Sequence, residues 1–119
     1  MKNCIASLIA VVALGFVAIS ADAGRIPGPG VNTTICQAKG SVTYFETFRG
    51  NELARIAIVG DGSTDLDVFV YDLQGRLIVQ GIGLTDREVV SWFPGRTQTY
   101  RIVVKNLGNT WNRFSMASN

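Results

Sequence analysis

The sequence predicts an all-β fold of the antiparallel β-sandwich class, with about seven to eight strands. Apolar and polar residues alternate in short runs, turn residues separate these runs every eight to twelve positions or so, and no stretch has a helical period. We expect strands over residues 42–48, 53–59, 66–72, 76–80, 88–93, 99–106 and 113–117. Glycine, proline and asparagine fill the links between them, which fits short hairpin turns.

Alternation within each expected strand predicts which side chains face the core, because successive side chains of a strand point to opposite faces of the sheet. The apolar positions of each run share one parity. The expected core residues are Ala54, Ile56, Ile58, Leu66, Val68, Val70, Val90, Trp92, Tyr100, Ile102, Val104, Phe114 and Met116.

Residues 1–23 have the pattern of a secretory signal peptide. Lys2 gives a positive start, residues 5–19 are apolar, and Ala21-Asp22-Ala23 is a small-x-small cleavage site. The apolar run is shorter than the roughly 20 residues that cross a bilayer. We therefore expect cleavage after Ala23, no membrane span afterwards, and a secreted or periplasmic protein.

The remainder of the chain is long enough for one domain. Residues 24–38 contain Pro27 and Pro29 and are expected to form a flexible leader, and residues 39–119 form the domain. Cys36 is the sole cysteine after cleavage, so an intramolecular disulfide is excluded there. Either Cys36 is a buried free thiol in a monomer, which is the expectation, or it forms an intermolecular disulfide.

The composition argues against several classes of function. A formal net charge of +2 is small, and the basic residues are spread singly along the chain, which predicts no nucleic-acid binding. The sequence has 0 histidines, so the commonest general base is missing, and it has no glycine-rich phosphate loop before a helix. We therefore expect a protein that is not an enzyme.

Several separated motifs resemble the bacterial pre-peptidase C-terminal (PPC) domain. They are residues 48–50, 60–72, 92–94, 100–108 and Asn112, so the resemblance extends over about residues 43–119. It implies a secreted, jelly-roll-like β-sandwich that usually accompanies an exported peptidase. Here the domain stands without a catalytic partner in the chain, as a free-standing form.

Asp61, Asp65 and Asp67 are candidate calcium ligands, because carboxylates on a turn that leads into a strand are a common oxygen source for this ion. The resemblance implies the same, since related collagen-binding domains of collagenases bind calcium. Ser63 stands where the commoner family turn has an acid, and Glu46 or Asp72 is a candidate to complete the site. The alternative function of these acids is to form the turn and keep the strand soluble.

Phe69 and Tyr71 alternate with core residues, so they are expected on the outer face of their strand as a contact surface. The alternative is that a neighbouring loop covers them. Trp111 lies in a turn and is a further candidate for binding. Asn106 and Asn112 flank that turn, and we expect them to satisfy local backbone groups.

These observations predict a secreted, non-catalytic module that binds an extracellular polymer or protein surface, with calcium as a candidate cofactor. The alternative is a structural or regulatory partner that docks in trans onto an exported peptidase, as the family's fused arrangement suggests.

Overall fold

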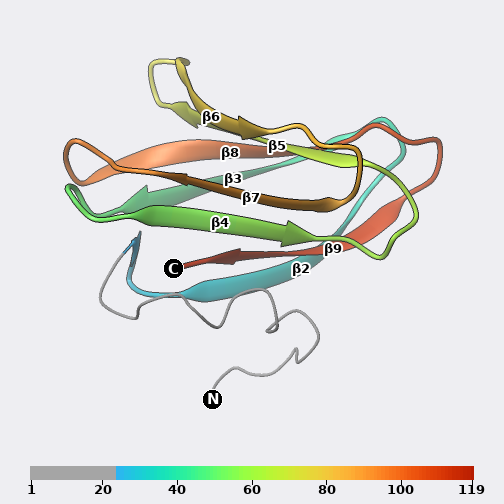
Figure 1. The fold of residues 1–119 in the computed structure, drawn as a ribbon, viewed down its shortest axis with the longest axis horizontal. Coiled ribbons are helices and arrows are strands. Elements are labelled where there is room, and N and C mark those ends of the chain that lie inside the picture. Colours follow the sequence, from blue (N-terminus) through green and yellow to red (C-terminus); the bar gives the residue numbers. More distant parts are fainter. Residues whose placement is uncertain (1–23) are drawn as a thin grey trace.

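The computed structural model describes residues 24–119, so the predicted signal peptide lies outside the described residues. This part of the chain is an all-β sandwich of nine strands (Figure 1). The strands are β1 (Arg25–Ile26), β2 (Gly30–Cys36), β3 (Ser41–Phe48), β4 (Ala54–Val59), β5 (Leu66–Asp72), β6 (Leu77–Gly81), β7 (Arg87–Trp92), β8 (Gln98–Asn106) and β9 (Asn112–Ser118). Residues 24–119 contain no helix of the length and apolarity needed to cross a membrane.

Two antiparallel sheets make up the sandwich. The five-stranded sheet has the order β1-β3-β8-β5-β6, and the four-stranded sheet has the order β2-β9-β4-β7. Figure 1 looks through both layers, with β4 and β7 in front of β3 and β8. The links β2–β3, β4–β5, β6–β7 and β8–β9 gather at one end, and the turns β3–β4, β5–β6 and β7–β8 gather at the other. The candidate site lies at the first of these ends.

The core lies between the inner faces of the two sheets, and every core residue expected from strand alternation is buried there. The burial pattern of β5 shows the principle, since Leu66, Val68 and Val70 are each 0% exposed. Aromatic rings close one part of the core, where Trp92 packs edge-on against Phe48 at 5.0 Å between ring centroids. All seven expected strands are present, each within one residue of the expected bounds.

The first strands differ from the sequence expectation. Residues 24–38 do not form a leader outside the fold, because β2 pairs along its whole length with β9, from Gly30 opposite Ser118 to Cys36 opposite Asn112. Pro27 precedes this strand and does not interrupt it. The physical reason is that β2 is an edge strand, which needs backbone bonds on one side only and accepts polar residues on its exposed face.

Cys36 at the end of β2 is buried and forms no disulfide within the described residues, as expected. It is 0% exposed, and burial raises the pKa of the thiol above its ordinary value. The strand that was expected to be a leader therefore contributes a side chain to the core.

Candidate functional site

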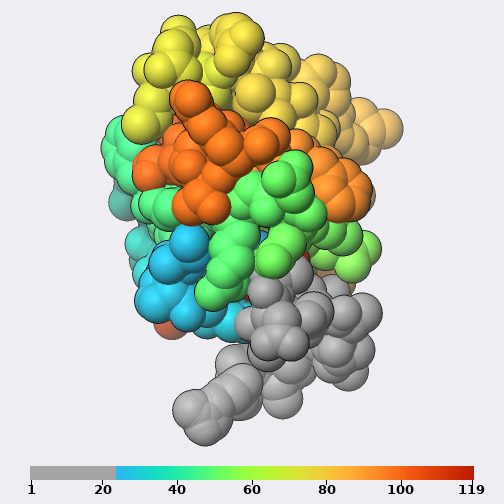
Figure 2. Space-filling view, turned by 90° about the vertical axis from the view of Figure 1, so that its left-hand side faces the viewer, coloured from blue at the N-terminus to red at the C-terminus, as the bar shows by residue number. Residues whose placement is uncertain are grey.

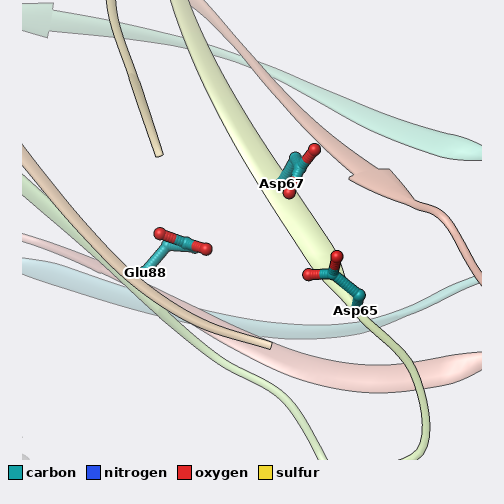
Figure 3. A group of neighbouring side chains, drawn as sticks. All are labelled: Asp65, Asp67 and Glu88. Atoms are coloured by element: carbon teal, nitrogen blue, oxygen red, sulfur yellow. The ribbon is translucent and has the colours of Figure 1, made fainter. Parts of the chain in front are cut away.

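Three carboxylates meet at the end of the sandwich where the four links gather. One oxygen from each of Asp65, Asp67 and Glu88 lies within 4.8 Å of the others. Figure 3 shows Asp67 on β5 and Asp65 just before the strand begins, with the Glu88 carboxylate facing them. We call these three residues the acidic cluster. The two aspartates were predicted from the sequence to be ligands, whereas Glu88 was not.

The two sheets each contribute to the acidic cluster. Asp67 is on β5 of the five-stranded sheet, and Glu88 is on β7 of the four-stranded sheet. Glu88 has the same parity as Val90 and Trp92, which both face the core. A charged residue at a core-facing parity was thus the sequence signal that could have identified Glu88.

The chain around the acidic cluster is held by specific contacts. Glu88 accepts a hydrogen bond from the Gly83 amide at 2.7 Å. A Cβ at Gly81 would lie 2.8 Å from a Glu88 oxygen, so a larger residue there would displace the carboxylate from its present position. Backbone bonds from the Leu107 amide to the Asp65 carbonyl and from the Leu66 amide to the Thr85 carbonyl fix the start of β5.

The carboxylates of the acidic cluster are short of hydrogen-bond partners. Asp67 is 8% exposed, and one oxygen of Asp67 and one of Asp65 are buried with no hydrogen-bond partner in the described part of the chain. Burial, and next the charge of Asp65, raise the pKa of Asp67, while Lys105 opposes the shift. Burial also raises the pKa of Glu88, and the charges of Asp67 and Asp65 act in the same direction. This arrangement could hold a metal ion, because a cation would satisfy the bare oxygens and offset the repulsion.

Asp61, the third aspartate of the predicted set, lies outside the acidic cluster. Its carboxylate accepts hydrogen bonds from the Ser63 hydroxyl at 2.5 Å, the Ser63 amide at 3.0 Å and the Arg113 amide at 3.0 Å. The Ser63 hydroxyl is the main cause that lowers the pKa of Asp61. Asp61 therefore closes its own turn and connects that turn to β9.

The two acids considered as further ligands are also engaged elsewhere. Glu46 forms an ion pair with Arg25, and Asp72 forms one with Arg76 at 2.8 Å. Neither belongs to the acidic cluster.

A buried polar network lies beside the acidic cluster. Asn112 is 0% exposed, and its amide donates to an Asp86 carboxylate oxygen at 3.0 Å and to the Thr64 hydroxyl at 3.1 Å. Its side-chain oxygen accepts from the Asp61 amide at 3.2 Å, and the same Asp86 oxygen accepts from the Gly62 amide at 2.6 Å. Asn112 thus joins three chain segments and satisfies local backbone groups, as expected from the sequence.

Asn106 has the corresponding role at the other side of the β8–β9 link. It is 0% exposed, and its amide donates to the carbonyls of Cys36 at 3.1 Å and Thr110 at 2.9 Å. Its side-chain oxygen accepts from the Gly108 amide at 2.9 Å. Both asparagines therefore stabilise the end of the sandwich that contains the acidic cluster.

Phe69 and Tyr71 lie on the outer face of β5. Their rings stack at 6.4 Å between centroids with an interplanar angle of 23°, and both side chains are half-buried. The Arg101 guanidinium lies over the Tyr71 ring, 4.3 Å from its centroid. Both rings line a cavity of about 300 Å³, and we call this cavity the outer-face cavity. Its other lining residues are Lys39, Gly40, Ser41, Arg101, Val103 and Lys105.

Trp111 is separate from the outer-face cavity. Its side chain is half-exposed in the link between β8 and β9, and it does not line that cavity. Its carbonyl accepts a hydrogen bond from the Ser63 hydroxyl at 3.1 Å. The three aromatic candidates therefore form one pair and one isolated residue.

Comparison with known proteins gives similarity of fold alone. No family model and no curated protein sequence matches the chain. Among solved structures, the pre-peptidase C-terminal domain of a collagenase from Bacillus anthracis is similar, with a TM-score of 0.59 at 11% identity, covering 74% of this chain and 88% of that one. The Aeromonas hydrophila periplasmic inhibitor of g-type lysozyme, PliG, has a TM-score of 0.59 at 13% identity, covering 85% and 90%. The mitogen from Yersinia pseudotuberculosis has a TM-score of 0.55 at 15% identity, covering 79% and 86%.

Proposed function

We propose that this chain is a secreted or periplasmic, non-catalytic β-sandwich module that binds an extracellular polymer or protein surface with the help of calcium. The acidic cluster is the observation that carries the proposal, because one buried oxygen of Asp65 and one of Asp67 have no hydrogen-bond partner within the described residues. The cluster also adjoins the proposed contact surface, since Asp67, Phe69 and Tyr71 follow one another at alternate positions of β5.

The chemistry of the ligands favours calcium. The acidic cluster offers carboxylate oxygens and no nitrogen or sulfur, a set that suits a hard cation and not a transition metal. Asp65, Asp67 and Glu88 would hold the ion, with carbonyls or water completing the roughly six to eight oxygens that calcium takes. Bound calcium would join β5 to β7 and so stabilise the end of the sandwich beside the contact surface.

The absence of catalysis is proposed from the residue inventory. The sequence has 0 histidines, so no imidazole is present to activate a serine or the Cys36 thiol. Cys36 is buried, with its pKa raised, which disfavours the reactive thiolate. Fold similarity to the PPC domain and to the lysozyme inhibitor is in keeping with a binding module.

Thermal unfolding in chelator and then in millimolar calcium tests the metal site. A ligand that binds the folded state alone stabilises it by about 2.7 kcal/mol at a concentration of 100 times its Kd. We expect a clear rise in Tm for the wild type and no rise for Asp67→Asn or Glu88→Gln. Asp61→Asn is the matched control and should keep the rise, because Asp61 lies outside the acidic cluster. A wild-type Tm that does not respond to calcium would contradict the calcium site.

Co-sedimentation tests the binding function itself. The purified protein is incubated with insoluble polysaccharides, collagen and cell envelopes, each with chelator and with calcium. We expect at least one of these materials to retain the protein, with stronger retention in calcium. Failure to sediment with all three would contradict the binding module.

A further inference from the structure

The outer-face cavity gathers cations that are far apart in the sequence. In the register of the five-stranded sheet, Lys105 of β8 lies opposite Ser41 of β3 and Asp67 of β5, and Arg101 of β8 lies opposite Tyr71 of β5. Alternate positions of β8 therefore place Arg101 and Lys105 on the same outer face. Lys39 enters from the link before β3. Three basic side chains thus line one cavity of about 300 Å³.

These cations are not neutralised by ion pairs. The ion pairs within residues 24–119 are Arg25 with Glu46 and Arg76 with Asp72, so Lys39, Arg101 and Lys105 have no carboxylate within 4.0 Å. Lys39 donates to the Leu107 carbonyl at 2.6 Å, and this bond to a neutral acceptor does not remove its charge. Asp67 lies opposite Lys105 and its charge partly offsets that of Lys105, so Lys39 and Arg101 supply most of the positive charge that makes the cavity complementary to an anion.

Arg101 is held in a fixed position. Its guanidinium packs on the Tyr71 ring at 4.3 Å, which limits its rotation and leaves its planar edge available. A guanidinium edge binds a carboxylate through two parallel hydrogen bonds. The stacked rings of Phe69 and Tyr71 add an apolar surface next to these donors.

The basic side chains and the aromatic rings of the outer-face cavity together favour one class of ligand. The negative faces of aromatic rings attract the partly positive C–H groups of a sugar ring, while the cations bind a carboxylate. A cavity of about 300 Å³ is at the lower end of ligand pockets, which are roughly 300–1,000 Å³, so it accommodates a short stretch of polymer. A neutral polysaccharide gives the three cations no partner. A nucleic acid would need a longer track of cations than the three that line this cavity.

From these contacts we infer that the outer-face cavity binds a carboxylated sugar unit of an acidic polysaccharide. The inference rests on the proposed function and names the class of polymer. Arg101 and Lys105 bind the carboxylate, Lys39 supplies further positive charge, and Phe69 contacts the sugar ring beside the Tyr71 ring that holds Arg101.

Affinity electrophoresis and calorimetry with polygalacturonate test this inference, with neutral dextran as the comparison polymer. Both are done in chelator, so that the result does not depend on the acidic cluster. We expect the wild type to bind polygalacturonate and not dextran. Arg101→Gln should weaken binding about tenfold through loss of a charge-assisted bidentate contact, and binding should fall as salt rises. Lys105→Gln, at an exposed position, is the second variant in case Arg101→Gln lowers stability.

Arg96→Gln is the matched control, because it removes the same charge from an exposed position. Arg96 lies in the β7–β8 turn, which Figure 2 shows at the opposite end of the sandwich, between the β5–β6 turn in yellow and the β3–β4 turn in green. The affinity of the Arg96→Gln variant for polygalacturonate should be within about twofold of the wild-type affinity. Equal losses for Arg96→Gln and Arg101→Gln would overturn the inference in favour of unspecific charge attraction.

The remaining outcomes separate the inference from the proposed function. If the wild type does not bind polygalacturonate in chelator but sediments with collagen or cell envelopes, the inference is wrong and the binding module stands. If it binds none of these materials, both are wrong.

Discussion

Two groups of carboxylates lie at the same end of this sandwich, and their surroundings differ. Asp61 and Asp86 accept hydrogen bonds from three backbone amides, the Ser63 hydroxyl and the Asn112 side chain. In the acidic cluster, Asp65 and Asp67 each leave a buried oxygen without a partner among residues 24–119. The carboxylates of the first group are hydrogen-bonded by the protein itself, whereas those of the second lie close to one another and have few hydrogen-bond donors.

The difference separates acids that hold the fold from acids that are free to take a ligand. Hydrogen bonds from the Ser63 hydroxyl and from backbone amides lower the pKa of Asp61, while burial and neighbouring charge raise the pKa of Asp67. Proximity in sequence therefore does not predict the role of an acidic residue, because Asp61, Asp65 and Asp67 belong to one short segment and have two different roles.

Removing the Asn112 side chain should have the largest effect on stability. Asn112→Ala leaves Asp86 short of a donor and the Asp61 amide without its acceptor, so we expect a loss of about 3 kcal/mol in the free energy of unfolding. Urea denaturation measures this loss. Asn109→Ala is the control, because Asn109 is exposed in the same link. A loss below about 1 kcal/mol would mean that the network is not required for the fold.

Neutralising Asp67 should stabilise the protein, in contrast to the loss of stability expected for Asn112→Ala. In chelator, Asp67→Asn removes one of three close negative charges, so we expect its Tm to exceed that of the wild type. Asp61→Asn should lower the Tm under the same conditions, because the Asp61 carboxylate accepts three hydrogen bonds. A lower Tm for Asp67→Asn in chelator would show that the acidic cluster is already satisfied without a cation.

The smallest effect is a dependence on pH. The pKa of Asp61 is lowered in the folded state, so its contribution to stability is present above its unfolded pKa of about 3.9 and is lost as pH falls through the folded value. The stability difference between wild type and Asp61→Asn should therefore be constant near neutral pH and diminish below about pH 4. Urea midpoints across this range measure it. A difference that is unchanged at low pH would exclude the Asp61 charge as its source.

The alternation of apolar residues was sufficient to predict most of the fold. In β5, for example, Leu66, Val68 and Val70 alternate with polar or aromatic residues. In a sandwich, this two-residue period requires the apolar side chains to face the core and the others to face outward. The β2 strand was not predicted, because Pro27 and the nearby glycines are typical of a flexible segment. The signal that could have identified it is the β-branched content of Val31, Thr33, Thr34 and Ile35.

The candidate site was predicted only in part, because its composition depends on which strands become neighbours. Asp65 and Asp67 were named from their own turn, but Glu88 reaches them from the other sheet. Similarly, the basic residues are scattered in the sequence, yet Lys39, Arg101 and Lys105 line one cavity because β3, β8 and β5 are adjacent. Local patterns fix the faces of strands, and sheet order decides which residues on those faces meet.

The position of Cys36 allows the opening rate of the edge of the four-stranded sheet to be measured. Its sulfur is sealed from solvent where β2 pairs with β9, so a thiol reagent reacts only when that edge opens. The rate of labelling under native conditions thus reports how often β2 separates from its neighbour. Comparing that rate with the rate of global unfolding distinguishes fraying of one strand from loss of the whole sandwich.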